Sequence, residues 1–372
     1  MKAAIAVFAG LALFCLPAQA QNTVMIANVV ELSGGGASNG ANWKEALELA
    51  ADEINAKGGI LGRKIELKHF DTQTNPGVSR AMVQKALDEN PYVIMGPIYS
   101  GSVKANMSLA QQAGVPQFVG AQAAELTQAG NNFLFRANIS QAVGMQKMAD
   151  YLTAKGSKTI ALVWVNNDFG KGGRDTLKKE LDRVGIKVVA DIPVDFGQMD
   201  FAADVLKVKN AGVDVVFPYM TAEDTARFVR EMRKQGVSTP MMGETTLLQQ
   251  NVIDLVGKDL DGARCHLSLT ADAPDEKVAA FRKRFEERFR HTPDHNALSS
   301  YMALYAVKHI TEKNGRIDRQ MLADALHGAT VKASDEPGIL LDSRWDGKGD
   351  VYRASFLGES VDGKIKIIEA IK

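Results

Sequence analysis

Cysteine is nearly absent from this chain of 372 residues, which has only Cys15 and Cys265. Cys15 lies in a leading segment that we expect to be removed, so Cys265 would have no partner inside the chain. No intramolecular disulfide is therefore expected, and stability must come from ordinary apolar cores. An excess of one charge is also absent, since 44 Lys and Arg residues balance 44 Asp and Glu residues. Nucleic acid and anionic membrane surfaces attract basic proteins, so we expect neither as a partner.

Motifs for phosphate cofactors, nucleophilic catalysis and metals are missing. There is no G-x-x-x-x-G-K-[ST] run, and after Gly34–Gly36 the residue Asn39 stands where G-x-G-x-x-G needs its third glycine. No G-x-S-x-G elbow occurs, and no histidine lies at a strand end suited to activating Ser100. A proline between His291 and His295 breaks the helix that would pair their rings, so we expect a surface loop there. The sequence therefore predicts a protein that binds neither a cofactor nor a metal ion and is not an enzyme.

Long apolar runs are also missing, apart from one at the start. Lys2 is followed by the apolar stretch Ile5–Leu16, then Pro17 and the small-residue motif A-Q-A. This pattern predicts a signal peptide over residues 1–20, cleaved before Gln21. The stretch is too short to span a bilayer. We expect the mature chain to be exported, and the periplasm is the expected location.

Segments typical of buried strands alternate with segments typical of amphipathic helices. Continuous apolar runs such as Val24–Val30 are typical of parallel strands buried on both faces, and Asn75-Pro76 is a helix-start signal. This alternation of strands and helices occurs in two consecutive series with no flexible linker between them. It predicts an α/β fold of two doubly wound lobes. The chain is expected to cross between the lobes several times, and these crossings would form a hinge that closes the cleft. We expect strands at 24–30, 65–70, 116–119, 159–165, 187–194, 213–219 and 241–242, and helices at 75–89, 141–155, 172–184, 201–210, 222–235, 275–290, 297–313 and 318–329.

One strand end carries a candidate anion site. The apolar segment that begins at Val93 runs into the turn Tyr99–Ser102, which opens a helix. This turn aims free backbone N–H groups and the hydroxyls of Ser100 and Ser102 at one point, with the positive end of the helix behind them. Such a turn is suited to a carboxylate or another small anion. Taken alone, the same residues also fit a plain helix cap.

The run Asp52–Gly62, which reads DEINAKGGILG, resembles the branched-chain amino-acid-binding proteins of ABC importers. Further blocks that resemble this family follow in order at Asp71, Asn75-Pro76, 96–102, 124–127, 167–172 and 345–350. The resemblance implies the type I periplasmic binding-protein fold, with two lobes joined by three strands. It places lobe 1 at residues 22–138 plus 270–354 and lobe 2 at 139–269 plus 355–372. The crossings are expected near 136–139, 266–270 and 354–357.

The resemblance implies that lobe 1 holds the carboxylate of an amino-acid ligand by the serine turn and by the loop after the next strand. Gln122 stands where the family usually has a threonine, and its longer amide either reaches into the pocket or turns outward. Asn39 stands where many relatives carry an aromatic residue. The implied positions in lobe 1 are Asn39, Tyr99, Ser100, Gly101, Gly120, Ala121 and Gln122.

Lobe 2 is expected to supply a lid. Phe169 matches a family aromatic residue that covers the ligand, although it also fits a core position. Tyr219 lies two residues before Thr221, where relatives often place a tyrosine, and it either forms an aromatic wall or packs in the core. Glu244 lies close to the position of an acidic residue that pairs with the ligand ammonium. If Glu244 points to solvent instead, the ligand lacks an amine.

The resemblance implies a solute-binding protein that captures a small carboxylate by cleft closure and delivers it to the membrane permease of an ABC transporter. An aliphatic, branched-chain amino acid is the first expected ligand, followed by an amide or urea and then an aromatic carboxylate. We expect a monomer. The sequence leaves a sensory role in place of import open, and a periplasmic hydrolase or lyase is a remote alternative.

Overall fold

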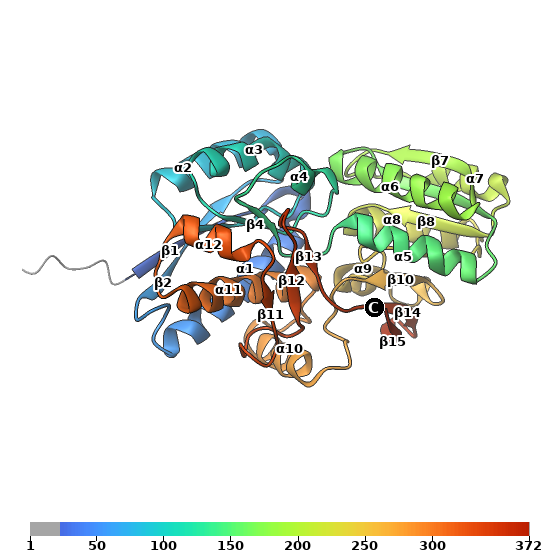
Figure 1. Ribbon diagram of the computed structural model, residues 1–372. Helices are drawn as coiled ribbons and strands as arrows, with labels where there is room; N and C mark the ends of the chain where they lie inside the picture. Colours follow the sequence, from blue (N-terminus) through green and yellow to red (C-terminus); the bar gives the residue numbers. More distant parts are fainter. Residues whose placement is uncertain (1–22, 372) are drawn as a thin grey trace, which may run out of the picture.

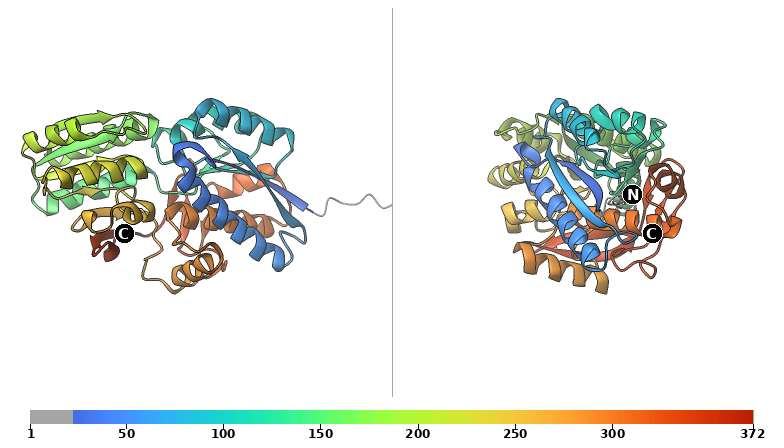
Figure 2. Two further views of the ribbon diagram at one scale, coloured as in Figure 1. Left: turned by 180° about the vertical axis from the view of Figure 1, so that it is seen from behind. Right: turned by 90° about the vertical axis from the view of Figure 1, so that its left-hand side faces the viewer.

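The computed structural model describes residues 23–371, so the expected signal peptide lies outside the described residues. Figure 1 shows two lobes side by side, and Figure 2 shows the same division from behind. Each lobe combines a sheet with helices on its faces. No helix between residues 23 and 371 has both the length and the apolar character needed to cross a membrane.

The first lobe is built on a parallel sheet with the strand order β2-β1-β3-β4-β5. Its strands are β1 (Thr23–Val30), β2 (Lys64–Asp71), β3 (Val93–Met95), β4 (Gln117–Val119) and β5 (Leu134–Arg136). Its helical segments are η1 (Gly34–Gly36), α1 (Ala37–Ala56), α2 (Pro76–Asp88), α3 (Ser100–Gln112), α4 (Glu125–Gln128), α10 (Glu276–Phe289), α11 (His295–Asn314) and α12 (Arg319–Leu326). A small antiparallel sheet adds β11 (Thr330–Val331), β12 (Ser343–Trp345) and β13 (Val351–Tyr352).

Helices cover both faces of this first sheet. Val29 of β1 packs in one buried cluster with residues of α2 and α3, whereas Ile26 belongs to a larger cluster with residues of α1 and α11. The apolar run of β1 is therefore buried on both sides, as the sequence predicts. Asn75 caps α2, because its side-chain oxygen accepts hydrogen bonds from the N–H groups of Gly77 and Val78.

The second lobe has a parallel sheet with the order β7-β6-β8 and a second sheet with the order β15-β14-β10-β9, connected by a bridge between Val216 and Met241. Its strands are β6 (Thr159–Val165), β7 (Lys187–Val194), β8 (Val215–Tyr219), β9 (Met242–Gly243), β10 (Arg264–Leu267), β14 (Ser355–Val361) and β15 (Lys364–Ile371). Its helical segments are α5 (Gln141–Ala154), α6 (Asp168–Val184), α7 (Ala202–Ala211), α8 (Ala222–Lys234), α9 (Gln250–Val256) and η2 (Gly257–Leu260).

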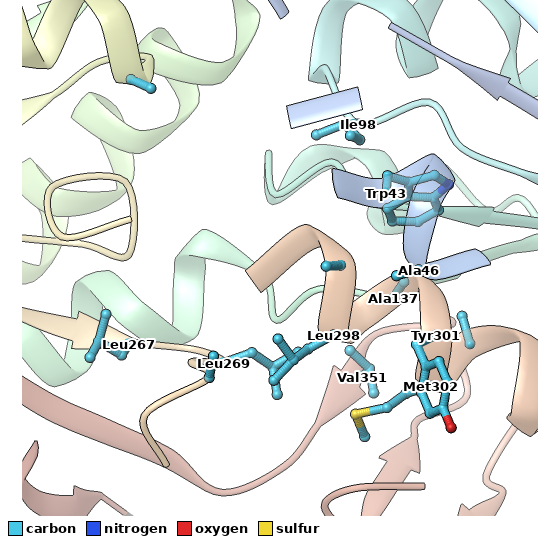
Figure 3. Close-up of a cluster of buried hydrophobic side chains, with 14 of the residues drawn as sticks. Trp43, Ala46, Ile98, Ala137, Leu267, Leu269, Leu298, Tyr301, Met302 and Val351 are labelled. Carbon is cyan, nitrogen blue, oxygen red and sulfur yellow. The ribbon is translucent and has the colours of Figure 1, made fainter. Parts of the chain in front are cut away.

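The chain passes between the lobes after β5, after β10 and after β13. Strands β10 and β14 pair antiparallel in the second lobe, while α10, which follows β10, and β13, which precedes β14, belong to the first. The apolar core follows one of these passages, where Leu267 and Leu269 lead toward Leu298 of α11 (Figure 3). The predicted α/β fold is confirmed. The division of the chain at 138/139, 269/270 and 354/355 stays a prediction.

Strand order decides where a ligand site can form. In both parallel sheets the first strand of the lobe lies between its two successors, β2 and β3 around β1, and β7 and β8 around β6. The chain then turns to opposite sides of the sheet after neighbouring strands, which opens a crevice at their carboxyl ends. The loops after β1, β3 and β4 therefore meet the loops after β6 and β8 between the lobes.

Some elements differ from the predictions. Helix α6 begins at Asp168 and not at residue 172, because the side chain of Asn167 accepts a hydrogen bond from the N–H of Gly170 and caps an earlier turn. Phe169 consequently lies on the first turn of this helix. The sequence analysis did not predict α9 or the short strands β5, β10 and β11, which depend on pairing with distant segments.

Candidate functional site

A pocket lies between the lobes and encloses about 450 Å³ free of protein atoms, including its open mouth. Seven of the eleven predicted site residues line it: Asn39, Tyr99, Ser100, Gly120, Gln122, Phe169 and Thr221. The sequence analysis did not predict five further lining residues: Ile98, Thr246, Gln249, His295 and Asn296. The predicted residues Gly101, Ala121, Tyr219 and Glu244 lie outside this lining.

The serine turn forms the first-lobe wall at the start of α3. Ser100 is 2% exposed, and its hydroxyl accepts a hydrogen bond from the N–H of Ala123 at 3.3 Å. The carboxylate of Glu31 lies behind the turn and accepts from the N–H groups of Ile98 (3.0 Å) and Tyr99 (3.3 Å). Burial raises the pKa of Glu31. The N–H groups that remain for a ligand are those of the first helical turn.

Arg136 shapes the loop after β4. This side chain is fully buried and donates hydrogen bonds to the carbonyls of Ala121 (2.7 Å) and Ala123 (2.6 Å), and it pairs with Asp350. Gln122 lies between Ala121 and Ala123 and belongs to the pocket lining, and its side-chain oxygen is buried without a hydrogen-bond partner among residues 23–371.

Gly120 packs closely against two side chains of the first lobe. A Cβ atom at this position would lie 3.0 Å from Trp43 Cζ3 and 3.2 Å from Ile98 Cγ1. Figure 3 shows Trp43 and Ile98 next to each other in the core. A larger residue at position 120 would therefore require these two side chains to shift by a few tenths of an ångström.

The second-lobe wall is formed by Phe169 and Thr221. The ring of Phe169 stacks on that of Tyr219 with the centroids 4.3 Å apart. Tyr219 is fully buried, and its hydroxyl donates to Gln141 Oε1 at 2.9 Å, so it supports Phe169 from behind. Thr221 donates its hydroxyl to Asp224 Oδ2 at 2.8 Å.

Glu244 occupies neither of the two positions expected for it. Its side chain is only 3% exposed, so it does not point to solvent, and it does not line the pocket. One carboxylate oxygen contacts His266 Nδ1, and the other accepts from the N–H of Thr245 at 2.9 Å. The missing side chain of Gly144 provides the space, because a Cβ atom there would lie 1.6 Å from Glu244 Oε1.

The surface loop predicted at 291–295 is present at residues 291–294, where His291 is partly exposed, but the prediction is wrong for His295. His295 is 6% exposed, because Asp294 caps α11 by accepting from the N–H groups of Asn296 (2.8 Å) and Ala297 (3.0 Å) and so fixes His295 on the buried first turn. Burial lowers the pKa of His295, so its imidazole is neutral at neutral pH. Within residues 23–371 no cluster of His, Cys, Asp and Glu side chains is suited to a metal ion.

Unpartnered polar atoms converge on the pocket from both lobes. Buried side-chain atoms on its lining that have no hydrogen-bond partner among residues 23–371 are Tyr99 Oη, Gln122 Oε1, Thr246 Oγ1, Gln249 Oε1 and Nε2, and His295 Nδ1. Leaving such an atom unpaired costs about 1–3 kcal/mol. No Asp, Glu, Lys or Arg side chain belongs to the lining. The pocket is therefore suited to a compact ligand that supplies several hydrogen bonds.

Polar contacts join the lobes around this pocket. Lys104 of α3 pairs with Asp168 of α6 at 2.8 Å, and Ser38 of α1 donates to Glu223 of α8 at 3.1 Å. The lobes thus meet on the sides of the pocket.

Comparisons with known proteins agree with this architecture. The model of the family described as periplasmic binding protein matches residues 23–363. The leucine-, isoleucine-, valine-, threonine-, and alanine-binding protein of Pseudomonas aeruginosa is 25% identical over 358 residues, which cover 94% of this chain and 93% of the relative. The Streptococcus pneumoniae branched-chain amino acid transporter substrate-binding protein in complex with isoleucine has a TM-score of 0.84 at 21% identity, with 94% of this chain and 98% of that chain covered. A Rhodopseudomonas palustris solute-binding protein in complex with benzoate has a TM-score of 0.86 at 21% identity, with coverage of 94% and 96%.

Proposed function

The chain belongs to the periplasmic binding protein family, and we propose that it captures a small carboxylate between its lobes and delivers it to an ABC permease. The observation that carries this proposal is the set of buried, unpartnered polar atoms on residues from both lobes that line one pocket. A ligand that pairs with them removes their desolvation cost only when the lobes are closed. The predicted export to the periplasm belongs to the same proposal.

The carboxylate end of the ligand is proposed to lie at the start of α3. The first-turn N–H groups of this helix, the hydroxyl of Ser100 and the positive helix end all favour an anion there. Gln122 stands on the same wall and adds an amide. Isoleucine and benzoate, the ligands in the two similar structures, both carry a carboxylate next to an apolar body.

A branched-chain aliphatic amino acid is the first candidate ligand. The relatives support it, because they are branched-chain amino-acid-binding proteins. For this class the ammonium needs a negative partner, and Glu244 is the acidic residue that the resemblance places near it. Glu244 would have to exchange its contact with His266 for one with the ligand.

The second candidate is a carboxylate without an ammonium, such as an aromatic acid, or a neutral amide or urea. It is favoured by the absence of any acidic side chain from the lining and by the pairing of Glu244 with His266. An ammonium buried without a counter-charge carries a large desolvation cost. Phe169 offers the flat apolar surface that an aromatic ligand requires.

Isothermal titration calorimetry with matched ligands tests both candidates. L-Leucine and 4-methylpentanoate share a skeleton and differ only in the ammonium, and benzoate serves as the aromatic probe. The first candidate requires leucine to bind at least about tenfold more tightly than 4-methylpentanoate. The second requires the reverse order or tight binding of benzoate. Binding of none of these three carboxylates would contradict the proposal.

Glu244→Gln separates the same candidates within the protein. Under the first, this variant weakens leucine binding by about 2–5 kcal/mol, because the ammonium loses its counter-charge. Under the second, ligand affinity stays within about threefold and only stability falls. We propose that no ligand is chemically changed, and mass analysis of each probe after prolonged incubation tests this against a hydrolase.

Delivery to a permease is tested by uptake of the radiolabelled ligand in cells that lack the chain. Loss of uptake that the intact gene restores is expected for an importer. Intact uptake with a lost response to the ligand would instead assign the chain to sensing.

A further inference from the structure

We infer that Phe196, which does not line the pocket, is a positioning residue that reaches across from the second lobe, fixes Tyr99 and holds the lobes closed. The effect of Phe196 on ligand binding rests on the proposed function above. The effect of Phe196 on closure of the lobes can be tested without a ligand. Phe196 lies in the loop between β7 and α7. We call the contact of Phe196 with Gly35 and Tyr99 the aromatic clasp.

The glycine run Gly34–Gly36 supplies the socket of the aromatic clasp. A Cβ atom on Gly35 would lie 2.7 Å from Phe196 Cζ, and a Cβ atom on Gly36 would lie 2.7 Å from Tyr99 Cε2. Two consecutive glycines therefore make room for two rings, one from each lobe. The run Gly34–Gly36, which does not match the dinucleotide-binding motif, thus has a role in the contact between the lobes.

The two rings meet edge to face. Their centroids are 6.1 Å apart and their planes are inclined by 81°. Tyr99 lines the pocket, and its buried hydroxyl has no partner among the described residues. Phe196 packs on the Tyr99 ring, so it acts on a ligand only by restricting where the Tyr99 hydroxyl can lie.

The loop that carries Phe196 is connected to the pocket wall. The N–H of Gly197 donates to Asp224 Oδ2 at 3.2 Å, and the same oxygen accepts the hydroxyl of Thr221, a lining residue. Asp224 is buried and also pairs with Arg227. Displacement of the Phe196 loop therefore disturbs the acceptor that orients Thr221.

Phe196 is 40% exposed even with the lobes in contact. A phenylalanine with this much exposed surface contributes little to the core of its own lobe. Its ring packs against Gly35 and Tyr99 of the first lobe. The exposure therefore agrees with a contact that forms on closure and separates on opening.

Binding kinetics with L-isoleucine and benzoate as probes test the aromatic clasp. Phe196→Ala is expected to raise koff about 3- to 30-fold, since it removes an edge-to-face pair and part of an apolar contact. The value of kon should stay within about twofold, because the ligand enters the open state. Phe196→Tyr should keep the koff of the wild type. Met199→Ala is the matched control, because Met199 lies in the same loop and is 78% exposed.

A double-mutant cycle separates the clasp from a general loss of structure. Gly35→Ala crowds the Phe196 ring and should raise koff in the wild type, but it should have no further effect in Phe196→Ala. Additive effects of the two substitutions, or an equal change in Met199→Ala, would overturn the inference.

A measurement without ligand tests the aromatic clasp even if the proposed function is wrong. Spin labels at Lys85 of α2 and Lys179 of α6, both exposed, report the separation of the lobes by pulsed electron resonance. Cys265 is buried, which limits labelling to the introduced cysteines. Phe196→Ala and Gly35→Ala should move the distribution toward longer distances. Identical distributions in wild type and both variants would overturn the clasp, even if neither probe binds.

Discussion

Replacing Ser100 by alanine removes one hydroxyl from the proposed carboxylate anchor. Ser100 is 2% exposed and lines the pocket at the first residue of α3. A hydrogen bond to a charged group contributes about 1.5–3 kcal/mol, so the affinity for a carboxylate ligand should fall roughly 10- to 150-fold. The substitution also leaves the N–H of Ala123 without its acceptor, which should lower the free energy of unfolding by about 1 kcal/mol.

Ser102→Ala is the matched control for this prediction. Ser102 is equally buried and lies on the same helical turn, but it does not line the pocket, and its hydroxyl faces Glu31. Titration calorimetry with isoleucine and benzoate measures the affinities, and urea unfolding measures the stability. Ser102→Ala should keep the wild-type affinity within about threefold. An unchanged affinity in Ser100→Ala, or an equal loss in both variants, would refute the assignment of the anchor.

Three further predictions concern stability. Arg136→Met should lower the free energy of unfolding by about 3–5 kcal/mol in urea titrations, since Asp350 loses its buried counter-charge. Partial burial raises the pKa of Asp191, but hydrogen bonds from Arg174 and two other donors outweigh this and lower it to about 2. Wild type should therefore lose about 1 kcal/mol more than Asp191→Asn as pH falls from 4 to 2, as followed by thermal melts. Tyr219→Phe should cost about 1 kcal/mol of stability but change ligand affinity less than threefold by calorimetry, because its hydroxyl bonds inside the lobe.

Sequence periodicity predicted the long elements well because their stability comes from local patterns. Strands β6 and β7 lie at the predicted residues, and Asn75 begins α2 as expected. The start of α6 was misplaced by four residues, since the capping contact of Asn167 competes with the glycines that follow it. Strand β10 was missed because it depends on pairing with β9, some twenty residues earlier, and with β14, some ninety residues later.

The first-lobe side of the site was accessible from the sequence because a helix start after a buried strand has a fixed geometry. Other positions on the lining were not accessible from the sequence. His295 is 195 residues from Ser100, and its place on the lining depends on how α11 packs beneath the first sheet. The direction of Glu244 depends on the absence of a side chain at Gly144 and on His266, which no local pattern connects.

Native mass spectrometry of gently purified protein tests most directly whether the pocket between the lobes holds a small carboxylate. Spectra are compared for wild type and Ser100→Ala, as purified and after addition of isoleucine or benzoate. The proposed function predicts one bound molecule per wild-type chain, released as a carboxylate on denaturation and depleted in Ser100→Ala. An unliganded mass under every condition, or equal occupancy in both proteins, would contradict it.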